Sequence, residues 1–208
     1  MKRIVYLFIL VVLASCGQKV FNEKWTKQKA PDVFRAKFET TQGDFVIVAK
    51  REWSPQGVDR LYTLIKNGFY KDIAVFRVVP NFVAQFGIHN DSVVNRSWRK
   101  FPLDDEPVVL KNDSMTVSFA RGGKRTRTNQ IYINLKNNNR LDTYEGGGVK
   151  GFPGIAKVIS GMENVQKFYG KYGDKLGRRQ DSIQKYGNKF LKKNYPEIDY
   201  IKTAYILK

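Results

Sequence analysis

Residues 76–87 read FRVVPNFVAQFG, and this stretch decides the fold that we expect for the chain. A Pro-Asn pair interrupts the apolar run, which predicts two short strands joined by a turn. Side chains alternate between the two faces of a strand, so Arg77 can share one surface with Phe82 and Gln85. An arginine among so many apolar neighbours is either an ordinary edge-strand residue with its head in water or part of a functional site.

The sequence on both sides of this stretch is mainly β in pattern. Residues 33–50 hold two runs of alternating apolar and polar residues around a Gln-Gly-Asp turn, which predicts an antiparallel hairpin. Eight short strands of this kind favour a closed barrel, because closure removes exposed sheet edges. Besides the hairpin, the expected strands cover residues 75–79, 82–86, 115–120, 130–135, 154–159 and 198–207.

Two helices are expected to cover the open ends of this barrel. Ser-Pro at residues 54–55 is a typical helix start, and apolar residues then recur at helical spacing until Gly68. Ser160 and Glu163 form a capping-box pattern ahead of a second helix. The apolar pattern over residues 183–191 predicts a further helix that packs on the barrel.

The N-terminal region differs from the rest of the chain. Lys2 and Arg3 precede an apolar run that is short for a membrane span and ends in small residues, which predicts a secretory signal peptide. Cys16, the only cysteine, follows Leu-Ala-Ser, a pattern that resembles the lipobox of bacterial lipoproteins and implies lipidation of its thiol. The alternative is a leftover thiol. The 208 residues therefore divide into a signal peptide (1–15), a lipidated tether (16–31) and one domain (32–208).

The predicted export and the charge of the chain limit its partners. Gly17 is not the aspartate associated with inner-membrane retention, so we expect the periplasmic side of the outer membrane. A formal net charge of +18 favours anionic lipid, lipopolysaccharide or acidic polypeptides, and an exported protein meets little nucleic acid. The basic loop 121–127 has no interleaved aromatic residues, so we expect a solvated loop that steers acidic clients. His89, the only histidine, is expected to be solvated as well.

Three blocks of sequence, in order, resemble the cyclophilin family. Residues 76–85 resemble the signature Phe-x-Arg-Val/Ile-Ile/Val-Pro-x-Phe-x-x-Gln, with the aromatic residue directly before the arginine. Residues 116–135 resemble the segment that ends in Gln-x-Phe-Ile, and residues 154–162 are similar to Phe-Gly-x-Val-x-x-Gly-Met. The resemblance, which covers residues 33–207, implies a closed eight-stranded antiparallel β-barrel capped by two α-helices. It also implies a monomeric peptidyl-prolyl cis-trans isomerase without cofactor or metal.

By this resemblance, Arg77 is the catalytic residue. Its guanidinium would donate a hydrogen bond to the prolyl nitrogen and so weaken the resonance that opposes peptide rotation. The same resemblance implies an apolar pocket for the proline ring, made by Phe82, Val83, Tyr132 and Leu141. Gln85, Gln130 and the backbone around Ala120 and Arg121 would hold the substrate chain. For the apolar side chains, the alternative is ordinary barrel core.

Two departures from the family pattern affect the expected site. The tryptophan that recognises cyclosporin falls at Arg140, so cyclosporin sensitivity is not expected. The pocket histidine has no clear match, and Phe152 is nearest to its position. We therefore expect an isomerase that acts on proline-containing polypeptides among exported proteins and is held at the membrane by its N-terminal lipid. The alternatives are a non-catalytic peptide-binding chaperone or scaffold of the cell envelope and, from charge alone, a protein that binds polysaccharide or lipopolysaccharide.

Overall fold

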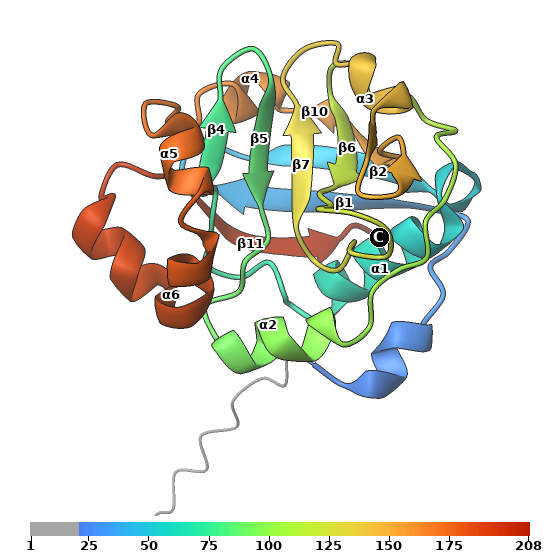
Figure 1. The fold of residues 1–208 in the computed structure, drawn as a ribbon, viewed down its shortest axis with the longest axis horizontal. Coiled ribbons are helices and arrows are strands. Elements are labelled where there is room, and N and C mark those ends of the chain that lie inside the picture. Colours follow the sequence, from blue (N-terminus) through green and yellow to red (C-terminus); the bar gives the residue numbers. More distant parts are fainter. Residues whose placement is uncertain (1–20) are drawn as a thin grey trace, which may run out of the picture.

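The computed structural model describes residues 21–208, so the predicted signal peptide and Cys16 lie outside the described residues. Nine strands of this part form one antiparallel sheet that curls into a half-barrel (Figure 1). Their order is β3-β11-β1-β2-β10-β6-β7-β5-β4. The bounds are β1 (Val33–Thr40), β2 (Phe45–Lys50), β3 (Ile73–Ala74), β4 (Arg77–Val79), β5 (Val83–Phe86), β6 (Thr116–Phe119), β7 (Ile131–Asn134), β10 (Gly154–Ser160) and β11 (Tyr200–Ile206).

All eight predicted strands are present. The predicted closed eight-stranded barrel is wrong, because the sheet has nine strands and remains open. The ninth strand, β3, and β4 are the two edges of the sheet and do not pair with each other. They are two and three residues long, and only Val75 and Phe76 separate them in the sequence. The amide of Val75 donates to the carbonyl of Asp199, 2.8 Å away, so the chain leaves the β11 edge only just before β4 begins.

Alternation along the first hairpin produces the core, as the sequence predicts. On β1 the side chains of Phe34, Ala36 and Phe38 are buried, and their neighbours in the strand are more exposed. Phe38 stacks on Phe45 of β2 with ring centroids 4.8 Å apart. Burial of these apolar side chains stabilises the folded sheet.

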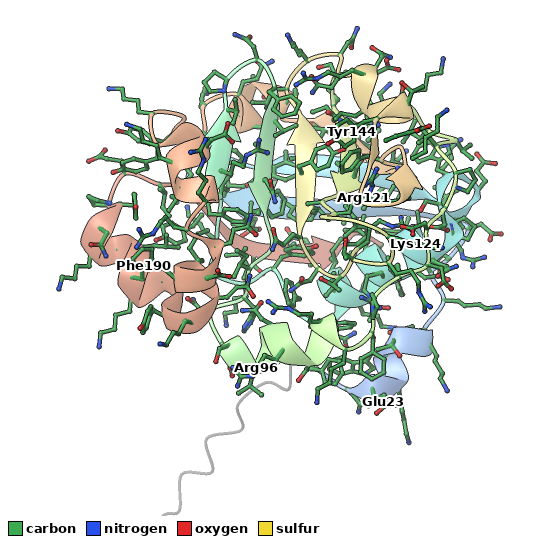
Figure 2. All side chains as sticks on the ribbon, in the orientation of Figure 1. Glu23, Arg96, Arg121, Lys124, Tyr144 and Phe190 are labelled. Carbon is green, nitrogen blue, oxygen red and sulfur yellow. The ribbon has the colours of Figure 1, made fainter. Side chains whose placement is uncertain are left out.

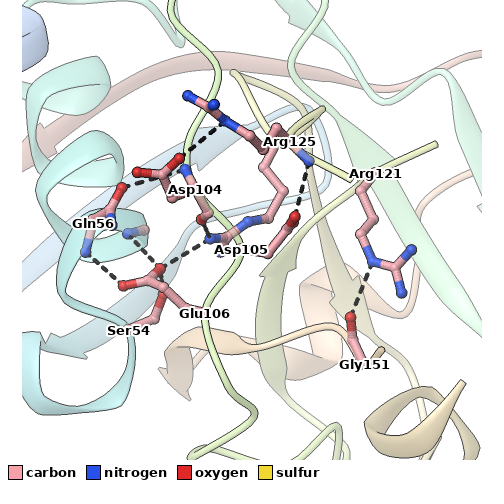
Figure 3. Close-up of polar contacts among 10 residues, drawn as sticks. Ser54, Gln56, Asp104, Asp105, Glu106, Arg121, Arg125 and Gly151 are labelled. Atoms are coloured by element: carbon pink, nitrogen blue, oxygen red, sulfur yellow. Dashed lines mark hydrogen bonds and ion pairs between the residues drawn. The ribbon is translucent and has the colours of Figure 1, made fainter. Parts of the chain in front are cut away.

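The predicted helix after residue 54 is confirmed as α1 (Pro55–Lys66). The Ser54 side chain makes no cap hydrogen bond to the helix. The helix N-terminus is capped instead by a carboxylate that is distant in the sequence. Glu106 accepts hydrogen bonds from the backbone amides of Gln56 (2.8 Å) and Gly57 (3.1 Å) and from the Ser54 hydroxyl (Figure 3). A carboxylate at this position satisfies free amides and favours the helix dipole.

The described residues contain more helices than the three that we predicted. The helix α6 (Gln180–Asn194) confirms the expected packing helix, whereas α2 (Ser92–Arg99) was not predicted. The capping-box prediction is wrong, because Ser160 ends β10 and the single turn α4 (Met162–Val165) begins after Gly161 at φ 80°. No helix within residues 21–208 is long and apolar enough to cross a membrane. The shorter elements are η1 (Glu23–Lys27), η2 (Arg51–Trp53), α3 (Arg140–Thr143), α5 (Gly173–Gly177) and the small hairpin β8 (Glu145–Gly146) and β9 (Val149–Lys150).

The described part of the predicted tether is packed against the body of the protein. The ring of Phe21 meets that of Trp98 on α2 edge-on, with centroids 5.1 Å apart. The amide of the buried Ala30 donates to the Asp59 carboxylate of α1 over 2.8 Å. The folded body therefore begins upstream of residue 32.

Candidate functional site

The site begins at the β4–β5 hairpin. The amide of Phe82 donates to the carbonyl of Val79 (3.0 Å) across a tight turn in which Asn81 has φ 59°, a conformation that asparagine tolerates. Arg77 and Gln85 are directly paired across the two strands, and Arg77 Nη1 donates to Gln85 Oε1 over 3.2 Å. The Arg77 guanidinium carbon lies 5.5 Å from the centroid of the Phe82 ring. The prediction that these three side chains share one surface is confirmed.

A pocket of about 360 Å³ lies against this hairpin and collects nearly all the predicted site residues. Gln130 is the exception, because it lines a neighbouring pocket of about 240 Å³. The two pockets share Gln85, Ala120, Arg121 and Gln180, so Gln130 lies next to the main pocket. The predicted residues in the main pocket are Arg77, Phe82, Val83, Gln85, Ala120, Arg121, Tyr132 and Leu141.

The apolar floor of the pocket is distinct from the main core of the sheet. Val83, Tyr132 and Leu141 are buried and form a small cluster of their own. Phe82, Ala120 and Phe152 pack against it and remain partly exposed. These side chains line the pocket, although Val83, Tyr132 and Leu141 are themselves buried.

Asn112 supports the floor from below and is fully buried. Its Oδ1 accepts a hydrogen bond from the Tyr132 hydroxyl (2.9 Å), and its Nδ2 donates to Asp142 Oδ1 and to the Phe152 carbonyl, each over 2.8 Å. Burial raises the pKa of Tyr132, so its hydroxyl remains a donor. One amide side chain thus ties β7 to α3 and to the loop that carries Phe152.

Arg121 holds the loop on the other side of the pocket. Its Nε donates to the Gly151 carbonyl (3.0 Å, Figure 3), and Nη1 and Nη2 donate to the carbonyls of Gly146 (2.9 Å) and Val149 (3.1 Å). Figure 2 shows Arg121 near Tyr144 and Lys124, on the loops beside β6 and α3. Burial lowers the pKa of Arg121. Its side chain therefore organises the β8–β9 hairpin.

The backbone at this position is only partly available to a substrate. The amide of Ala120 already donates to the carbonyl of Gln130 over 3.0 Å, one residue beyond the paired part of β6 and β7. A substrate chain would therefore need other groups of the predicted Ala120–Arg121 backbone. The predicted role of this backbone in holding the substrate chain therefore excludes the Ala120 amide.

The prediction of a solvated basic loop over residues 121–127 is wrong for Arg127, whereas Lys124 and Arg125 are exposed. Arg127 is 1% exposed, and its Nη2 lies 3.1 Å from Glu106 Oε2. Arg125 Nε lies 3.0 Å from Asp104 Oδ1, and its amide donates to Asp105 (Figure 3). The acidic run 104–106 therefore neutralises much of the loop. The sequence did not reveal this pairing because it joins segments about twenty residues apart.

His89 is also less solvated than we predicted. Its ring lies 5.3 Å from the Phe69 ring, and its Nδ1 accepts a hydrogen bond from the Asp91 amide over 3.0 Å. Burial lowers its pKa, although the nearby Asp91 carboxylate partly opposes the shift. His89 does not line the main pocket.

Residues that the prediction missed form one wall of the pocket. They come from α5, the first residue of α6 and the link between them, a segment that lies just ahead of the helix predicted over residues 183–191. Asp174 Oδ1 lies 2.6 Å from Arg77 Nε. Gln180 Oε1 accepts from Gln130 Nε2 over 3.0 Å. The missed lining residues are Asp174, Gly177, Arg178 and Gln180. Phe152, the residue nearest to the position of the family's pocket histidine, also lines the pocket.

Comparisons with known proteins agree with this geometry. A peptidyl-prolyl cis-trans isomerase-like 2 of Gibberella zeae is 34% identical over 134 residues, which are 62% of this chain and 23% of that protein. Peptidyl-prolyl cis-trans isomerase B of Escherichia coli is 27% identical over 147 residues, 69% of this chain and 89% of the relative. The chain thus spans less than a quarter of the fungal protein and most of the bacterial one.

The solved structures give the same fold. A cyclophilin type peptidyl-prolyl cis-trans isomerase of Cryptosporidium parvum superposes with a TM-score of 0.57 at 18% identity and covers 85% of this chain and 98% of its own. The family described as cyclophilin type peptidyl-prolyl cis-trans isomerase/CLD matches residues 35–187, which include the hairpin, the apolar floor and α5. This chain therefore belongs to the cyclophilin-type peptidyl-prolyl cis-trans isomerase family.

Proposed function

We propose that this protein accelerates the cis/trans isomerisation of peptide bonds that precede proline. The observation that carries the proposal is the position of Arg77, a cation at the edge of a small apolar cluster that is separate from the core. The cluster fits a proline ring, which is apolar and rigid. The Arg77 guanidinium can donate a hydrogen bond to the peptide amide next to that ring.

The chemistry needs little more than these parts. Resonance in the peptide bond creates a barrier of roughly 18–20 kcal/mol to rotation. A hydrogen bond from Arg77 to the prolyl nitrogen is stronger when that nitrogen has left the plane, so it lowers the barrier. Each reduction of about 1.36 kcal/mol gives about a tenfold rate increase, and no covalent intermediate forms.

A solved relative supports a proline-containing substrate. The Cryptosporidium parvum cyclophilin type isomerase was crystallised in the presence of the dipeptide Ala-Pro. Its fold covers 84% of this chain. We carry that ligand class to the pocket beside Arg77.

The test must separate catalysis from binding alone. Exchange between the cis and trans forms of a short X-Pro peptide is measured by NMR with catalytic amounts of the purified protein, and peptide affinity is measured in parallel. Acceleration of exchange supports the isomerase. Peptide binding without acceleration would instead identify a non-catalytic peptide-binding chaperone or scaffold.

We further propose that the protein is attached by a lipid on Cys16 and acts on proteins exported to the cell envelope, where slow X-Pro isomerisation limits folding. The support is the lipobox-like sequence ahead of the only cysteine, and Gly17 favours the outer membrane. Incorporation of a labelled fatty acid and membrane fractionation, with Cys16→Ser as the control, test the attachment. We expect label and membrane association in the wild type and loss of both in the variant. An unlabelled wild type would refute the lipid anchor.

A further inference from the structure

The short helix α5 lies directly against the catalytic strand. Figure 1 shows α5 beside β4, although about a hundred residues separate them in the sequence. A Cβ atom added to Gly177 would lie 2.9 Å from Arg77 Cδ, so the absence of a side chain there permits the contact. The end of α5 therefore approaches the aliphatic stem of Arg77 as closely as a backbone can.

The same helix supplies the strongest polar partner of Arg77. Asp174 Oδ1 accepts a hydrogen bond from Arg77 Nε over 2.6 Å, and Gln85 Oε1 accepts from Nη1 over 3.2 Å. Within residues 21–208 the structure shows no partner for Nη2. The guanidinium is planar, so fixing two nitrogens also fixes the direction of the third. Nη2 keeps both of its N–H groups for a substrate amide, and Nη1 keeps one.

The segment also reaches Gln85 through two amide side chains. Gln85 Nε2 donates to Gln130 Oε1 over 3.0 Å, and Gln130 Nε2 donates to Gln180 Oε1 over 3.0 Å. Asp174 and Gln180 are thus the two ends of one hydrogen-bonded chain that passes through Arg77, Gln85 and Gln130. Both ends belong to the α5–α6 segment, which the sequence did not connect with the site.

We propose that Asp174 is a positioning residue for Arg77. It holds Nε so that Nη2 remains directed to the peptide in the pocket, and this inference rests on the proposed isomerase function. A long arginine side chain without this carboxylate would sample other rotamers and present the donor less often. The cost falls on kcat more than on KM, because the hydrogen bond to the prolyl nitrogen matters most in the twisted state.

The test compares three variants at Asp174 with a matched control. Asp174→Ala removes the acceptor, Asp174→Asn keeps a neutral acceptor, and Asp174→Glu keeps the charge. Asp181→Asn removes one negative charge from an exposed residue of the same segment that makes no ion pair among the described residues. Asp174 is half exposed, so we expect Asp174→Ala to lower kcat/KM by about three- to fivefold. Asp174→Asn should lose less, Asp174→Glu should recover activity, and Asp181→Asn should match the wild type.

A second background separates positioning from a merely structural role. Arg77→Lys has no Nε–H group, so Asp174→Ala should cause no further loss of activity in that variant. An equal loss in both backgrounds, or unchanged kcat in Asp174→Ala, would overturn the inference. If Asp174→Ala fails to fold, the comparison is made with Asp174→Asn, which retains the shape of the side chain.

A spectroscopic measurement does not depend on turnover. The Arg77 Nε–Hε resonance, assigned by its loss in Arg77→Lys, should exchange slowly with water in the wild type and rapidly in Asp174→Ala. Rapid exchange in the wild type would contradict the contact itself. A wild type without isomerase activity would overturn the proposed function, whereas an active wild type that Asp174→Ala leaves unchanged would overturn only this inference.

Discussion

At the scale of single residues, Arg77 lies beside Gln85 and Phe82 on one surface, and Asn112 supports the apolar floor next to it through the Tyr132 hydroxyl. Arg77, Phe82 and Gln85 lie together because strand alternation and a tight turn are local properties. Asn112 was not predicted, although it is fully buried and holds the floor. Its role depends on partners twenty to forty residues away, which no local period reveals.

We expect Asn112→Ala to lower the free energy of unfolding by roughly 1–3 kcal/mol, because it leaves buried partners such as the Tyr132 hydroxyl and the Phe152 carbonyl unsatisfied. Urea denaturation measures the change. Tyr132→Phe is the matched control, because it removes one donor and keeps the ring, so its cost should stay below about 1 kcal/mol. An equal loss of unfolding free energy in the two variants would show that the other hydrogen bonds of Asn112 add no stability.

At the scale of elements, strands were easier to predict than helices. The eight strands follow from period-two patterns, whereas closure depends on whether the edge strands β3 and β4 pair, which no local pattern indicates. The helix α2 had a usable signal, since Asp91 caps it by accepting from the Val93 amide over 2.6 Å. The single turn α5 had none, because its contacts with Arg77 come from the tertiary structure.

The segment that leads into α2 should make stability depend on pH. Burial lowers the pKa of His89 in the folded protein below its usual value of 6.5, so the unfolded chain binds the proton more readily. The stability that comes from burying neutral His89 should therefore be fully present above about pH 6.5. It should be lost as the pH drops through the folded-state pKa.

The imidazole signals of His89 in NMR test this directly, because the chain has one histidine. We expect a midpoint below 6.5, and His89→Gln should reduce the loss of unfolding free energy on acidification. A midpoint at or above 6.5 would contradict the burial of the ring.

At the scale of the whole molecule, composition was the weakest guide. A net charge of +18 suggested a basic loop free to attract acidic clients, yet Asp104, Asp105 and Glu106 engage much of it. The same Glu106 caps α1, so this acidic run joins the loop to the helix (Figure 3). The N-terminal segment likewise packs on α2 through Phe21, where composition suggested a free tether.

The molecule as a whole thus presents one surface suited to prolyl peptides, with a cation at its edge and an apolar floor. The measurement that tests this most directly is the rate of cis/trans exchange in an X-Pro peptide with wild type, Arg77→Lys and Arg77→Ala, each shown to be folded by its NMR spectrum. We expect clear acceleration by the wild type and a fall of kcat/KM by about 100-fold in Arg77→Ala, with Arg77→Lys in between. A folded Arg77→Ala variant as active as the wild type would contradict the role of Arg77.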